Sequence, residues 1–153
     1  MHTEHLQNVH PVRVMAGWLV AVAVTSVTVF VFIVLGLLGT EAPADAVWAV
    51  TAVAVGFLVG GWFTGMRTLE APILHGIALS LTSLVVWAFL NLFVILLGGD
   101  EWSGLGATAT LVVLLTQVVA AVAGAWVGTR GARLRSSELS DSPESGVRGR
   151  GEQ

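Results

Sequence analysis

The strongest polar signals deep in the apolar runs of this sequence are two neutral amides. Gln117 falls at the centre of the run 105–129, and Asn91 lies within the run 73–97. A neutral amide in a membrane can line a pore, bind a ligand or join helices by hydrogen bonds, and joining helices is the commonest of these uses. No Asp, Glu, Lys or Arg interrupts the runs 14–38, 46–66, 73–97 and 105–129, so no carboxylate or cation is available at depth for proton transfer.

Hydroxyl groups lie at a depth similar to that of Gln117, and together they predict a polar layer in the membrane. We expect Gln117 to hydrogen-bond a Thr-Ser pair of another helix, and Asn91 to pair with Thr110. The alternative is that each Ser or Thr bonds a carbonyl group of its own helix. The predicted layer consists of Thr25, Ser26, Thr82, Ser83, Asn91 and Gln117.

Most other chemistry is missing from the sequence. The chain has no cysteine, which excludes disulfides, thiolate nucleophiles and cysteine-based metal sites. His75 and Glu70 form a pair without a third ligand, so we interpret His75 as a structural residue at the membrane interface. No phosphate loop, nucleophile elbow or zinc motif is visible. We therefore predict no catalytic residue, no metal site, no cofactor and no nucleic-acid partner, and the residues of any cofactor site stay unknown.

The composition predicts an all-α, polytopic membrane protein. Of 153 residues, 55% are hydrophobic and only 11% are charged, and the mean hydropathy is +0.84. Each of the four apolar runs is long enough to cross a hydrocarbon core of about 30 Å as a helix. In lipid the backbone must satisfy its own hydrogen bonds, so these Val-rich runs are expected to be helices. Residues 14–129 are then one transmembrane domain.

The distribution of charge predicts the orientation. The loops 39–45 and 98–104 carry acidic residues and no Arg, whereas all seven Arg lie on the other side. By the positive-inside rule the segment 1–13 and the tail 130–153 are cytoplasmic. The tail is rich in Ser, Gly and Arg, so we expect it to be disordered. Arg used in place of Lys in an Ala-, Val- and Gly-rich chain indicates a GC-rich prokaryotic genome, so we expect the membrane to be a prokaryotic cytoplasmic (inner) membrane.

Two apolar runs share an ending. "GGWFTGMR" closes the second run and "GAWVGTR" closes the fourth, so the spacing of Gly61, Gly65 and Arg67 returns in the later segment. The chain therefore reads as two tandem helical hairpins related by a pseudo-two-fold axis along the membrane normal, unless the match is due to chance. Small residues let helix backbones approach in lipid, although a ligand groove for a lipid or pigment is an alternative use. The predicted packing residues are Gly56, Gly60, Gly61, Gly65, Gly124 and Gly128.

The stretch "VGGWFTGMRTLEAPILHGIALSL" resembles small, uncharacterised four-helix bacterial membrane proteins. It combines a Gly-rich helix end, an Arg, a short loop and a His-Gly opening of the next helix. The resemblance covers about the middle third of the chain. It implies a membrane topology and carries no activity.

Two functional hypotheses follow from the sequence. The first is a non-enzymatic accessory, structural or assembly subunit of a membrane complex, or a homo-oligomer, whose partners are the lipid bilayer and other membrane subunits or copies of itself. The second is a small oligomeric channel or carrier that uses the Thr, Ser and Gln positions as a path. An intramembrane enzyme is disfavoured because acids, nucleophiles and metal ligands are missing at depth.

Overall fold

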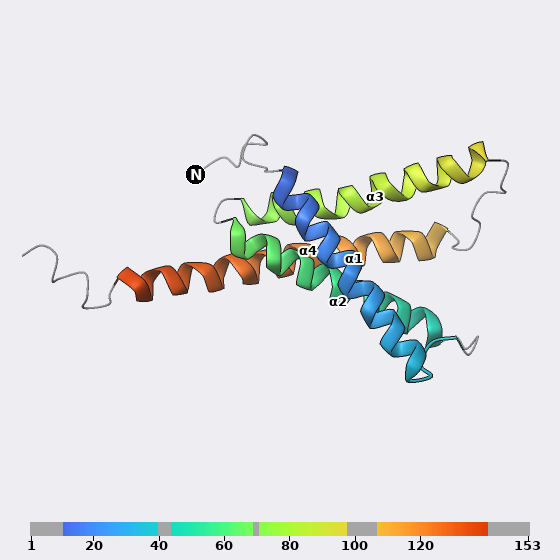
Figure 1. Ribbon diagram of the computed structural model, residues 1–153, viewed down its shortest axis with the longest axis horizontal. Helices are drawn as coiled ribbons and strands as arrows, with labels where there is room; N and C mark the ends of the chain where they lie inside the picture. Colours follow the sequence, from blue (N-terminus) through green and yellow to red (C-terminus); the bar gives the residue numbers. More distant parts are fainter. Residues whose placement is uncertain (1–10, 40–43, 69–70, 98–106, 141–153) are drawn as a thin grey trace, which may run out of the picture.

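The computed structural model describes residues 11–39, 44–68, 71–97 and 107–140, and within them the chain is all-helical, without strands. The helices are α1 (Pro11–Val34), α2 (Ala44–Arg67), α3 (Pro72–Leu96) and α4 (Ala107–Ser140) (Figure 1). Each contains a stretch that is long and apolar enough to cross a membrane. The prediction of an all-α protein with four membrane-spanning helices is confirmed.

The four helices form two hairpins that cross. α1 packs along α2, α3 packs along α4, and the hairpins meet mainly through α2 and α4, which run in the same direction (Figure 1). The start of α1, the end of α2 and the last third of α4 lie toward one end of the bundle (Figure 1). These segments contain Arg13, Arg67 and Arg130, so we call it the basic end. The hairpins diverge toward the opposite end, which we call the distal end. Contact between the hairpins is therefore concentrated near the basic end.

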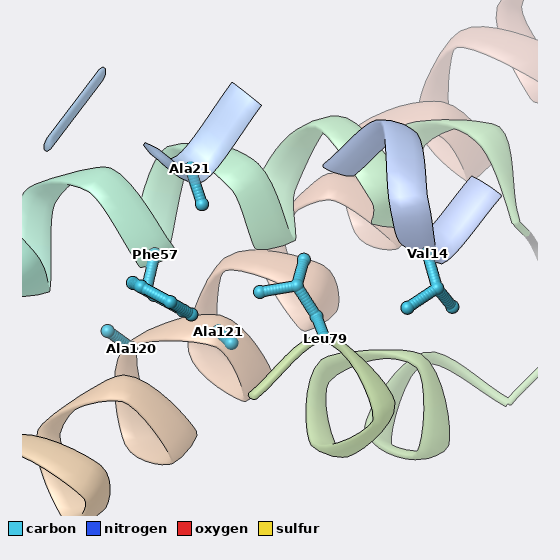
Figure 2. Packing of buried hydrophobic residues seen from close by; sticks show 6 residues of the cluster. All are labelled: Val14, Ala21, Phe57, Leu79, Ala120 and Ala121. Atoms are coloured by element: carbon cyan, nitrogen blue, oxygen red, sulfur yellow. The ribbon is translucent and has the colours of Figure 1, made fainter. Parts of the chain in front are cut away.

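Most buried residues are small and, apart from Ala52, they lie in the half of the bundle nearer the basic end. The core cluster contains two large side chains, Phe57 and Leu79, which point toward alanines of α1 and α4 (Figure 2). In the distal halves even large side chains stay uncovered: Phe89 is 68% exposed and Leu96 is 74% exposed. Close approach of backbones, more than interlocking of large side chains, holds the helices together, as is common for helices in lipid.

The contact between α2 and α4 is reciprocal. A methyl group built on Gly61 or Gly65 would overlap the carbonyl group of Ala121 or Ala125 on α4. A methyl group on the corresponding residues of α4 would equally overlap the backbone of α2, 2.8 Å from the Trp62 nitrogen for Gly124 and 2.9 Å from the Met66 nitrogen for Gly128. The pattern is symmetric between the helices: Gly61 lies against the carbonyl of Ala121, three residues before Gly124, and Gly124 lies against the carbonyl of Leu58, three residues before Gly61.

Small residues also set the distance between α1 and α2. Gly60 faces Ala21 and the carbonyl of Gly17, with 2.6 Å between a methyl group built on Gly60 and each of these neighbours. One turn nearer the distal end, Gly56 leaves the room that the Thr25 side chain fills. The six glycines predicted as packing residues thus all lie at helix contacts, at positions where a side chain would meet backbone or a β-carbon of the next helix.

The two hairpins are not packed identically. Gly17 of α1 lies against Gly60 and Thr64 of α2, whereas Gly76, the similar glycine of α3, lies against Val122 of α4. The α2–α4 contact has the reciprocity that a tandem repeat predicts, but the contacts inside the hairpins differ in register. That the chain is two copies of one hairpin stays a prediction.

The first helix ends earlier than predicted. α1 ends at Val34, although the apolar run continues to Leu38, because Gly36 adopts a left-handed conformation with φ of 70°. The Leu37 N–H then donates to the Phe32 carbonyl at 2.8 Å and the Gly36 N–H donates to Ile33 at 2.9 Å. This pair of hydrogen bonds is the Schellman motif, which satisfies the last carbonyls of a helix and stops it.

The prediction of a disordered tail is wrong for its first part. α4 continues without a break through Arg130 to Ser140. Ala132, Arg133, Leu134 and Arg135 all have good helix propensity, and a helix that already exists in the membrane extends without a new nucleation step. The segments 1–10 and 141–153 lie outside the described residues, as do Glu70 and three acidic residues of the distal loops, Glu41, Asp100 and Glu101. The fourth, Asp45, lies in the first turn of α2 and accepts a hydrogen bond from the Gly39 N–H at 3.0 Å.

Replacing Gly124 by Ala should destabilise the bundle by about 1–3 kcal/mol, because the new methyl group overlaps the α2 backbone. Gly131→Ala is the matched control: it lies in the same helix with no atom within 4 Å of a built methyl group. Ala at that site should stabilise the helix by about 0.5–1 kcal/mol. Thermal unfolding in detergent, followed by circular dichroism, measures both. Equal unfolding temperatures for the two variants would contradict the packing described above.

Candidate functional site

The six side chains predicted for a membrane polar layer do not gather at one place. Gln117 and Ser83 line a cavity between α3 and α4, and Thr25 lies against Gly56 between α1 and α2. Ser26 is exposed on α1. The remaining two, Thr82 and Asn91, bond carbonyls of their own helix. The predicted layer is therefore not formed as one hydrogen-bonded group.

Hydrogen bonds within a single helix account for two of these six groups. The Thr82 hydroxyl donates to the Ala78 carbonyl at 2.9 Å, and the Asn91 amide donates to the Trp87 carbonyl at 2.9 Å. The predicted bond between Asn91 and Thr110 is not formed. Ser and Thr side chains can reach the carbonyl four residues earlier in their own helix. They bond this local carbonyl where no group of the next helix is close enough.

The cavity between α3 and α4 is the best candidate site in the described part of the chain. It has a volume of about 100 Å³ and lies between the Gly76–Val122 contact and the distal end. A cavity of this size has room for a few water molecules, since one water takes up about 30 Å³ in the liquid, or for a small polar molecule. It is lined by Ser83, Leu84, Trp87, Thr110, Val113, Leu114 and Gln117.

The Gln117 amide gives this cavity its chemical character. Its Oε1 atom is buried and accepts no hydrogen bond within the described residues. Leaving a buried acceptor unsatisfied costs about 1–3 kcal/mol. With the hydroxyls of Ser83 and Thr110 in the same lining, the cavity offers neutral donors and acceptors. Such groups bind and orient a polar ligand by hydrogen bonds and carry no formal charge.

Two further buried polar atoms have no partner in the described part of the chain, namely Thr25 Oγ1 and Trp18 Nε1. Thr25 sits at the close contact with Gly56, where its hydroxyl is enclosed by the backbone of α2. Trp18 packs against the core cluster. Neither atom lines the α3–α4 cavity, so the three groups do not form one site.

Sequence reasoning missed a group of buried polar residues near the basic end. The Thr129 hydroxyl lies 2.9 Å from the Ala125 carbonyl of its own helix, 3.2 Å from the Gly65 carbonyl and 3.3 Å from the Thr68 carbonyl. It therefore joins α4 to the end of α2. The available signal was its position directly after Gly128, inside the repeated ending.

His75 is completely buried at the start of α3. Its Nδ1 atom lies 3.0 Å from the Ala71 carbonyl, which also accepts the His75 backbone N–H at 3.2 Å. Ala71 has a left-handed φ of 48° and directly precedes Pro72. This geometry gives His75 a structural role in the turn between α2 and α3. Its pairing with Glu70 lies outside the described residues.

Among the described residues, no group of three or more His, Asp or Glu side chains could hold a metal ion. Comparisons with known protein families, with curated proteins and with solved structures find no match to this chain. The resemblance to small four-helix bacterial membrane proteins therefore stays an expectation.

Replacing Gln117 by Leu should leave the unfolding temperature unchanged or raise it slightly. The change removes a buried acceptor that has no partner and puts an apolar side chain of similar length into the cavity. Thermal unfolding in detergent measures the effect. The matched control is Thr129→Val, which should lower the unfolding temperature because it removes the hydroxyl that joins α4 to α2. A strongly destabilised Gln117→Leu variant would show that the amide is a structural bridge.

Proposed function

We propose that this chain is a non-enzymatic integral membrane protein that acts as an accessory, structural or assembly subunit of a membrane complex, or that assembles with copies of itself. The supporting observation is the division of the bundle into two halves. Near the basic end the helices are held by backbone contacts. In the distal halves of α1 and α3, exposed side chains occur at consecutive residues, so they lie on several sides of the helix. Such a pair of diverging hairpins has the shape to clasp a further helix.

Exposed side chains in the distal half fit a partner helix as well as lipid. Phe30 of α1 and Phe89 of α3 are 66% and 68% exposed. Aromatic residues supply large contact areas at protein interfaces with little loss of side-chain entropy. Association of helices in lipid needs close packing, since lipid tails already satisfy the hydrophobic requirement. The proposal therefore places the partner contact on the distal half, away from the glycine contacts.

The cysteine-free chain makes a direct test possible. A single cysteine at Phe89, carrying a photoactivatable cross-linker in native membranes, should capture a second subunit or a second copy. The matched control is a cysteine at Leu19, which is 59% exposed but lies in the half of α1 nearer the basic end. Gentle-detergent purification and mass spectrometry identify the product. Adducts with lipid alone at both positions would contradict the proposed subunit role.

The α3–α4 cavity favours a second candidate, a small oligomeric channel or carrier. Its supporting observation is the unpartnered Gln117 acceptor at a cavity in the membrane-spanning region. A defined homo-oligomer that conducts in liposomes would support this candidate over the first. Gln117→Leu should then abolish the flux while the unfolding temperature stays nearly constant.

We further propose that the membrane is a prokaryotic inner membrane and that both termini lie in the cytoplasm. The support is the position of all seven Arg on one side of the predicted topology. A fluorescent reporter that folds only in the cytoplasm should be bright when fused to the C-terminus. An alkaline phosphatase fused to the same point should be inactive. The reverse pair of results would contradict the proposed orientation.

A further inference from the structure

A second hollow lies on the outer surface of α4, beside the first turn of α3. It has a volume of about 440 Å³, within the range of about 300–1,000 Å³ that is usual for ligand pockets. Val119, Ala123 and Trp126 are exposed, so the groove opens to the surroundings of the helix. It is lined by Ile73, Val118, Val119, Val122, Ala123 and Trp126.

The positively charged side chain of Arg130 lies at the end of this groove. The Arg130 guanidinium lies over the ring of Trp126, 4.1 Å from its centroid, and that ring is part of the groove lining. Within the described residues no carboxylate forms an ion pair with Arg130. The groove thus combines an apolar wall with a fixed positive charge at the basic end, where a membrane-spanning helix meets the head groups.

We propose that this groove binds one phospholipid of net negative charge, with an acyl chain along the α4 wall and the phosphate on Arg130. A planar guanidinium pairs with phosphate oxygens through two parallel N–H groups. The acyl chain gains little by leaving other lipid chains for an apolar groove, so retention depends on the phosphate contact and on the fit of the chain. A zwitterionic lipid brings its own cation and gains less from Arg130. The inference is independent of the proposed subunit role.

The other hairpin provides an internal control. Arg67 lies over Phe63 at the same 4.1 Å, at the corresponding place on α2. The neighbouring face of α2 is covered, because Gly60, the position corresponding to Ala123, lies against Ala21 and Gly17 of α1. α3 crosses α4 at Gly76 and Val122 instead, which leaves the face of Ala123 open. Arg67 therefore has the same stacking without the open groove.

The test is native mass spectrometry of the delipidated full chain, titrated with dioleoyl-phosphatidylglycerol or with dioleoyl-phosphatidylcholine. The wild type should bind one phosphatidylglycerol more tightly than phosphatidylcholine. R130Q should weaken this binding by about tenfold or more, the loss expected for one charged hydrogen-bonding group. A123F should weaken it similarly by filling the groove, and R67Q should leave it unchanged. Unfolding temperatures check that each variant is folded.

Any other pattern overturns the proposal. An equal loss in R67Q and R130Q would mean that positive charge in general attracts the lipid. Undiminished binding in A123F would show that the lipid does not occupy the groove, and undiminished binding in R130Q would show that Arg130 does not bind the phosphate. Equal retention of the two lipids would show that the groove does not select for negative charge. A wild-type chain that retains no phosphatidylglycerol would show that the groove does not bind this lipid, as when a protein helix occupies it.

Discussion

The close approach of α2 and α4 is the contact on which the rest of this structure depends. Four glycines place the two parallel helices so near each other that carbonyl groups of one helix meet α-carbons of the other. In lipid, where burying apolar surface brings little, helices attract each other through close van der Waals packing, which such backbone contact provides. Each hairpin is anchored to the other through this contact, and the positions of α1 and α3 follow from it.

The difference between the two hairpins then determines which surfaces stay available. α1 lies tightly on α2 because Gly17, Gly56 and Gly60 remove the side chains between them. α3 has one such glycine, Gly76, so it meets α4 closely only near the basic end. The looser hairpin consequently holds both hollows described above, one polar and nearer the distal end, the other apolar and beside Trp126. The number of glycines at the helix contact thus distinguishes the tightly packed pair α1–α2 from the pair α3–α4, which leaves room for ligands.

Run length and small-residue spacing were sufficient to predict the four helices and the glycine contacts, because a helix in lipid has no alternative way to satisfy its backbone. The end of α1 was missed because apolar residues continue past Gly36, whose backbone conformation stops the helix. The polar layer was missed for another reason. Equal depth does not by itself bring side chains together: Thr25 and Ser26 lie on the other hairpin, and Asn91 and Thr82 bond carbonyls of their own helix.

The continuity of α4 has a mechanical consequence. Its 34 residues form one rod of about 50 Å, longer than the hydrocarbon core of about 30 Å. The rod is held against α2 at Gly124 and Gly128 and runs on past Arg130 to Ser140. These glycines fix the part of α4 that lies between its distal end and the helical extension after Arg130. Because the helix is unbroken, any change in the tilt of α4 about these contacts moves its Ser140 end as well.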